Sequence, residues 1–125
     1  MNITFLAVNC SYSHSSLASW RLHAAMRGDE VWRWNTVEVT VKDAPQSALE
    51  QVLACRPQVV AATLYLFNHD FVIGLLSQIR SKAADCLIVV GGPQCLGDNR
   101  AILRPEGPAD AALRGEGEQA FPELL

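Results

Sequence analysis

The chain has 125 residues, of which 50% are apolar and 18% are charged, and its formal net charge at pH 7 is −3. This size and composition predict one globular domain with a buried core and exclude a disordered chain. The acidic balance argues against the basic surfaces that bind nucleic acid or anionic membranes, so we expect neither partner. No apolar run approaches the ~20 residues needed to cross a bilayer.

The amino-terminal residues and the cysteines predict a cytoplasmic protein. The chain enters a strand-like segment at once, without the basic and apolar regions of a signal peptide. Its four cysteines are scattered and form no Cys-x-x-Cys pair. This spacing favours a reduced protein without a disulfide framework.

Strand-like and helix-like segments alternate along the chain. Short apolar or alternating runs predict strands at residues 2–8, 37–41, 59–66, 86–90 and 110–113. Apolar spacing and start and stop residues predict helices at residues 15–26, 45–56, from Asn68 or Asp70 to about residue 79, at about 99–103, and from 117 onward. A βα unit repeated five times implies a parallel sheet with helices on both faces.

The apolarity of the strands selects their order. The first, third and fourth strands are nearly continuous apolar sequence, as expected of strands covered on both faces. The second strand alternates and the fifth is short. The order 2-1-3-4-5 places these two at the edges, so we predict a flavodoxin-like (Rossmann-like) α/β fold with a five-stranded parallel sheet. The dinucleotide-type order would put the third strand at an edge and fits less well.

This order predicts a ligand site where the first and third strands end. Residues 9–16, 65–69, 91–95 and 114–118 converge there. The segment 9–16 holds four serines, a tyrosine and a histidine but no glycine, so the Gly-x-Gly-x-x-Gly turn of a nicotinamide site is missing. A helix cap at Ser15 or Ser16 explains part of this serine run, but not all of it.

Two other segments suit the close passage of a flat ligand. Gly91 and Gly92 end a buried strand, and Pro93 sets the direction in which the chain leaves it. A tight turn from strand to helix explains the same residues equally well. Thr63 places a hydroxyl inside an apolar strand, where it needs a partner from the backbone or from a ligand.

Metal-binding and catalytic groups are sparse. His14 is a candidate to bind a metal or a ligand, whereas His23 and His69 suit structural roles. Cys10 and His14 are too few for a protein-only zinc site. No nucleophile–base pair or carboxylate pair is visible, so the residues predict a binding module rather than a self-sufficient catalyst. The tryptophans are expected in the core or on a surface that docks another domain, namely Trp20, Trp32 and Trp34.

Four motifs, taken in order, resemble those of a known family. They are YSHSSLA at residues 12–18, VAATLYLFN at 60–68, VVGGP at 89–93, and RGEGE at 114–118 followed by Phe121. Each motif is weak alone, but the ordered set on a flavodoxin-like frame is specific. The whole chain resembles the cobalamin-binding amino-terminal domain of B12-dependent radical SAM enzymes, a superfamily that includes the anaerobic magnesium-protoporphyrin IX monomethyl ester oxidative cyclase.

The resemblance implies that cobalamin lies over the carboxyl ends of the strands, with its nucleotide tail inserted into the domain. Thr63 matches the hydroxyl that lines the tail pocket, and the tail passes the backbone at Gly91, Gly92 and Pro93. The corrin face would meet Asn9, Ser13, His14 and Tyr65, and the corrin edge would meet Gly115, Glu116 and Gly117.

Related mutase-type domains supply the lower cobalt ligand from an Asp-x-His-x-x-Gly run. This chain keeps only the histidine, so His14 is a candidate cobalt ligand without the carboxylate that would orient its imidazole. No Cys-x-x-x-Cys-x-x-Cys run is present either. We therefore expect the 4Fe–4S cluster and S-adenosylmethionine in a carboxyl-terminal radical SAM domain that follows residues 1–125 and performs methyl transfer or oxidative cyclisation.

Two alternatives stay open from the residues. A flavodoxin-like carrier would bind FMN through the serines of residues 9–16, although that loop normally carries a glycine at the phosphate. A cofactor-free interaction module would dock a partner through Trp32 or Trp34.

Overall fold

The computed structural model describes residues 1–10, 17–28, 31–114 and 117–125, and these residues form an α/β domain. The strands within them are β1 (Asn2–Asn9), β2 (Arg33–Thr40), β3 (Val59–Thr63), β4 (Leu87–Gly91) and β5 (Ala111–Ala112). The helices are α1 (Leu17–Ala25), α2 (Pro45–Ala54), α3 (His69–Lys82) and α4 (Gly117–Leu124), with a short 3-10 turn, η1 (Pro93–Cys95). None of the helices in these ranges is long and apolar enough to cross a membrane.

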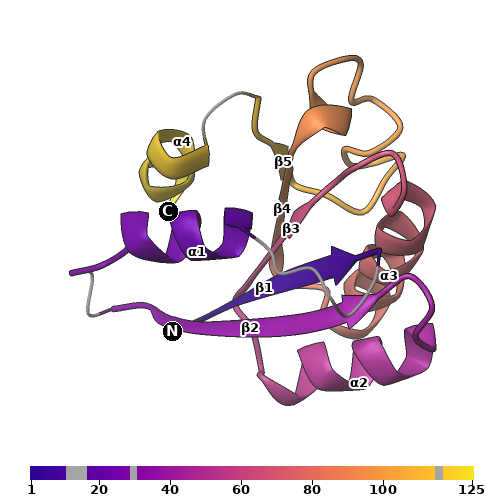
Figure 1. Ribbon diagram of the computed structural model, residues 1–125, viewed down its shortest axis with the longest axis horizontal. Helices are drawn as coiled ribbons and strands as arrows, with labels where there is room; N and C mark the ends of the chain where they lie inside the picture. The colour runs from indigo at the N-terminus through magenta and orange to yellow at the C-terminus, as the bar shows by residue number, and fades with distance from the viewer. Residues whose placement is uncertain (11–16, 29–30, 115–116) are drawn as a thin grey trace.

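The strands form one parallel sheet with the order β2-β1-β3-β4-β5 (Figure 1). This order confirms the flavodoxin-like prediction and the reasoning behind it. The six inner residues of the central strand β1 are all buried, whereas the edge strand β2 exposes side chains along much of its length. Central strands are covered on both faces and edge strands are not, which is why strand apolarity predicted the order.

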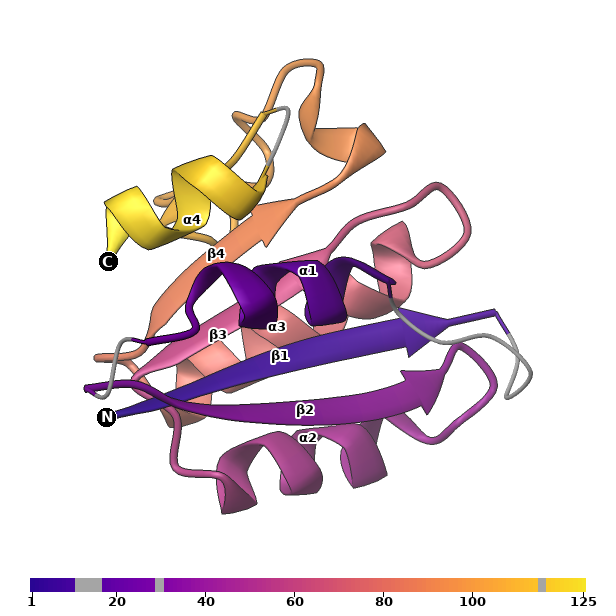
Figure 2. The same cartoon turned by 60° about the vertical axis from the view of Figure 1, so that its left-hand side comes forward.

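Helices cover both faces of the sheet, as predicted, with α2 and α3 on one face and α1 and α4 on the other (Figure 2). Successive residues of β1 alternate between the two cores. Leu6 and Val8 pack into the core under α2 and α3. Ile3 and Phe5 pack into the core under α1 and α4, where Phe121 is also buried.

Several predicted boundaries were wrong. β3 ends at Thr63 rather than at residue 66, because β4 itself ends at Gly91, whose carbonyl accepts the last ladder bond from the Leu64 amide at 2.7 Å. β2 begins at Arg33, earlier than predicted, because its first residues pair with β1 from Asn2 onward. The beginning of the predicted helix at residues 15–16 lies outside the described residues.

The helix predicted at about residues 99–103 does not form. The chain makes tight turns there instead, and Leu103 pairs with Ala109 in an isolated parallel bridge. Pro105 cannot continue a helix. A Cβ at Gly107 would lie 2.2 Å from the Ile102 carbonyl oxygen, so this turn requires glycine.

Candidate functional site

The topological switch point lies between β1 and β3. The chain leaves β1 toward β2 and leaves β3 toward β4, so the two connections depart in opposite directions at the carboxyl edge of the sheet. The loops that follow β3 and β4 are described at this edge. We call this region the carboxyl-edge site.

Asn68 joins the ends of β1 and β3. Its Nδ2 donates to the Val8 carbonyl at 2.9 Å and to the Thr63 carbonyl at 3.2 Å, and its Oδ1 accepts from the Tyr65 amide at 2.8 Å. The side chain is buried, so these bonds replace the solvent that its amide would otherwise bind. The sequence predicted Asn68 only as a helix cap. It does stand at the cap position of α3, but its side chain makes no capping hydrogen bond.

Gly92 occupies a position that only glycine fits. Its φ is +98°, and a Cβ there would lie 2.6 Å from Thr63 Cγ2 and 2.8 Å from the Leu64 carbonyl oxygen. Gly91 differs, because the nearest atom to its Cβ position is the Leu113 carbonyl oxygen at 3.8 Å. The predicted glycine pair therefore divides into Gly92, which the backbone requires, and Gly91, where a Cβ would make only ordinary van der Waals contact.

Large apolar side chains stand exposed on the loops of this edge. The Tyr65 and Phe67 rings stack with centroids 5.4 Å apart and planes 10° apart. Leu66 between them is 83% exposed, and Leu96, just after η1, is 62% exposed. We call these four residues the apolar rim. Exposed apolar side chains gathered on one edge mark a surface that another molecule covers. Sequence reasoning singled out only Tyr65 among them, because an apolar run after a buried strand does not reveal where the strand ends.

Three other predicted site residues lie at the ends of elements, each with its own neighbours. Asn9 ends β1, and its carbonyl accepts from the Val41 amide at 3.0 Å. Thr63 ends β3, partly buried and paired in register with Gly91. Gly117 begins α4, and its Cβ position lies 3.1 Å from Leu22 Cδ2 of α1, so close helix packing favours a glycine there.

Four of the predicted residues lie outside the described part of the chain, namely Ser13, His14, Gly115 and Glu116. The possible cobalt ligand is among them and stays a prediction. No group of three or more His, Cys, Asp or Glu residues within the described ranges is arranged to hold a metal ion.

A separate charged cluster fixes the beginning of β5. Asp110 accepts from the Ile88 amide at 2.8 Å and from the side chains of Arg80 and Arg104, while Arg80 also donates to the Pro108 carbonyl. Burial acts to raise the pKa of Asp110, but the hydrogen bonds from Ile88, Arg80 and Arg104 outweigh it and hold that pKa below its usual value. Asp110 precedes β5, so this cluster lies at the amino end of that strand, away from the carboxyl-edge site.

The family follows from the whole length of the chain. The sequence model of the B12 binding domain family matches residues 3–125. The chain belongs to the B12-binding domain family. Cobalamin is therefore its cofactor, and the comparisons do not favour an FMN carrier or a cofactor-free module.

Individual relatives agree with this assignment. A hopanoid C-3 methylase of Methylococcus capsulatus is 38% identical over 79 residues, which are 62% of this chain and 15% of the methylase. The cobalamin-dependent S-adenosylmethionine radical enzyme OxsB, solved with aqua-cobalamin and S-adenosylmethionine bound, aligns with 98% of this chain at a TM-score of 0.74 and 16% identity. A cobalamin-binding protein of Desulfitobacterium hafniense aligns with 99% of the chain and 58% of its own length, at a TM-score of 0.67 and 11% identity.

The domain is thus similar to the B12-binding domain of cobalamin-dependent radical SAM enzymes. It spans 15% of the methylase and 18% of OxsB, a small part of either protein.

Proposed function

We propose that this domain holds cobalamin over the carboxyl-edge site and presents it to a radical SAM domain of the same protein. The corrin would lie against the apolar rim, and the nucleotide tail would pass Gly91 and Gly92 beside Thr63. Asn9, Ser13, His14 and Pro93 would complete the inner surface, with Gly115, Glu116 and Gly117 at the corrin edge.

The observation that carries this proposal is the backbone at Gly92. The glycine brings the chain after β4 close against Thr63 and Leu64 at the end of β3. Gly91 pairs in register with Thr63 and places no side chain beside it, so backbone forms this surface. A bulky, flat cofactor needs such a surface at the switch point.

The apolar rim supports the same placement. Its stacked Tyr65 and Phe67 rings and the exposed Leu66 would be covered by a macrocycle of similar polarity, which makes their burial favourable. Asn68 gives the loop a fixed shape before the cofactor arrives, because it bonds the Tyr65 amide from a buried position. Cobalamin, when bound, supplies the cobalt chemistry, and the protein supplies binding and orientation.

The parent reaction is also a proposal. Because the chain spans a small part of its radical SAM relatives, we propose that a separate domain carries the 4Fe–4S cluster and S-adenosylmethionine and performs methyl transfer or oxidative cyclisation. We further propose a cytoplasmic location, since the four cysteines form no pairs and radical cofactors require a reducing environment.

An ultraviolet-visible titration with hydroxocobalamin, with FMN in parallel, tests the proposal. We expect saturable cobalamin binding and no FMN binding. Gly92→Ala should weaken cobalamin binding at least tenfold, whereas Gly97→Ala should not, because Gly97 has no atom within 4 Å of its Cβ position. Tyr65→Ser combined with Phe67→Ser removes two exposed rings of the loop after β3 and should also weaken binding. Cobalamin binding unchanged in both the Gly92 and the rim variants would overturn the placement.

A further inference from the structure

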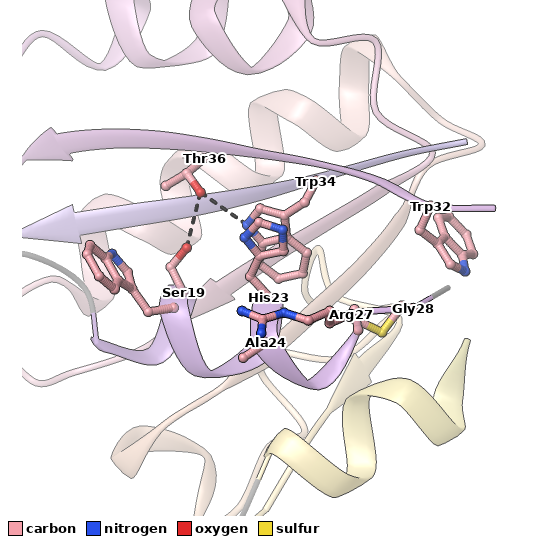
Figure 3. Close-up of a pocket in the computed structure, with 10 residues that line it drawn as sticks. Ser19, His23, Ala24, Arg27, Gly28, Trp32, Trp34 and Thr36 are labelled. Atoms are coloured by element: carbon pink, nitrogen blue, oxygen red, sulfur yellow. Dashed lines mark hydrogen bonds between the residues drawn. The ribbon is translucent and has the colours of Figure 1, made fainter. Parts of the chain in front are cut away.

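A second pocket lies away from the carboxyl-edge site, between α1 and the edge strand β2 (Figure 3). Its volume is about 490 Å³, within the range of pockets that bind small molecules. Its β2 residues belong to the amino-terminal half of that strand, where Trp34 pairs with Ile3 and Thr36 with Phe5 of β1. We call it the α1–β2 pocket.

All three tryptophans of the chain line this pocket. Trp32 lies just before β2 and Trp34 lies within it, and both pack against the core under α1 and α4. Trp20 and His23 are three residues apart and share one side of α1, and Arg27 follows in the turn after that helix. Three indoles, an imidazole and a guanidinium thus line one cavity.

The floor of the pocket is preorganised. The His23 ring stacks on Trp34 with centroids 5.1 Å apart and planes 2° apart, and Phe5 and Phe121 pack against the same indole from the core. Thr36 Oγ1 accepts from Trp34 Nε1 at 3.1 Å and lies 3.2 Å from Ser19 Oγ, as Figure 3 shows. Trp20, in contrast, is 71% exposed and offers a ring that the protein does not cover.

The charge of the pocket favours an anion. Among its described lining residues there is no carboxylate, and Arg27, which extends from the Gly28 end of the pocket toward Ala24, supplies a full positive charge (Figure 3). Another cavity, of about 440 Å³, lies on the opposite face of the sheet. It is similar in size and is lined by the cation Lys82, but none of its lining residues is aromatic. Of these two cavities, the α1–β2 pocket is the one whose described lining combines aromatic rings with a cation.

We propose that the α1–β2 pocket binds a planar aromatic anion. The ring system stacks on the exposed indole of Trp20, above the floor formed by His23 and Trp34, and the carboxylate or phosphate pairs with the Arg27 guanidinium, whose planar fork suits both groups. This site is separate from the carboxyl-edge site and does not rest on the proposed cobalamin function.

Nuclear magnetic resonance of the indole N–H groups in the full chain tests this proposal, with each signal assigned by a Trp→Phe substitution. We expect 2-naphthoate to shift the signals of Trp20, Trp32 and Trp34 saturably, in the millimolar range or tighter. Neutral 2-naphthylmethanol should bind about tenfold more weakly, and cationic 2-naphthylmethylammonium more weakly still, because Arg27 attracts only the anion.

Two variants sharpen the test. Arg27→Gln should weaken naphthoate binding about tenfold and remove the preference for the anion, while the matched control Lys82→Gln should change neither. Trp20→Ala should weaken binding severalfold, and its exposed ring makes unfolding no concern. Both pocket variants should keep the cobalamin affinity of the unsubstituted chain. No saturable shift at about 10 mM naphthoate, or equal binding of all three probes, would overturn the proposal.

Discussion

The backbone of Gly92 passes so close to Thr63 that a Cβ on the glycine would lie 2.6 Å from the threonine Cγ2. This contact joins the ends of β3 and β4 at the edge where the domain is proposed to hold its cofactor. It couples the stability of the domain to the shape of the carboxyl-edge site, because one residue serves both.

Gly92→Ala should lower the free energy of unfolding by about 1–3 kcal/mol, since the new methyl meets Thr63 and the Leu64 carbonyl at a positive φ. Gly97→Ala is the matched control and should change the free energy of unfolding by less than about 0.5 kcal/mol. Urea denaturation followed by circular dichroism measures both. Equal stability of the two variants would mean that the turn relaxes without cost.

Asn68→Ala should lower the free energy of unfolding by about 2–4 kcal/mol, because it removes three hydrogen bonds and leaves the Val8 and Thr63 carbonyls without this donor. Asn68→Asp should not rescue stability, since a carboxylate cannot donate to those carbonyls. Gln46→Ala, which loses one exposed hydrogen bond to Glu50, serves as the control. A small effect of Asn68→Ala on thermal unfolding would contradict its role as a brace.

Asp110 should make the domain sensitive to acid. The pKa of Asp110 is lowered in the folded state. Its contribution to the free energy of unfolding is therefore fully present above the unfolded-state pKa of about 4, and it is lost as the pH falls through the folded-state pKa. Asp110→Asn should therefore lower the free energy of unfolding by about 2 kcal/mol near pH 7. Below pH 4 the variant should lose less stability with falling pH than the unsubstituted chain. Asp98→Asn is the comparison, because the Asp98 side chain is 60% exposed and pairs with Arg100 on the surface. If Asp110→Asn lost stability below pH 4 as steeply as the unsubstituted chain, this explanation would be wrong.

The cysteines should differ in reactivity. Burial raises the pKa of the Cys86 and Cys95 thiols, which leaves little of the reactive thiolate at pH 8. Cys10 is exposed. Iodoacetamide should therefore alkylate Cys10 well before Cys86 or Cys95, as measured by mass spectrometry of timed digests. Equal rates under native conditions would show that the core around the buried thiols opens readily.

Local patterns in the sequence determined the elements and, through them, the order of the sheet. The continuous apolar run at β3 and the alternation from Val37 to Val41 each report how a strand is covered, and coverage depends on its place in the sheet. The position of the ligand edge then followed from topology alone. Gly91 was expected at the end of its strand and ends β4, whereas Thr63 was expected inside its strand and ends β3.

Tertiary structure alone decided the details that depend on distant contacts. Asn68 reaches Val8 across 60 residues, so nothing near it in the sequence distinguishes a brace from a helix cap. Trp20 lines the same pocket as Trp32 and Trp34 only because α1 packs beside the edge strand, and the sequence around each tryptophan carries no signal for that packing. Short-range patterns record how each segment is covered, whereas the packing of segments against one another decides which side chains meet.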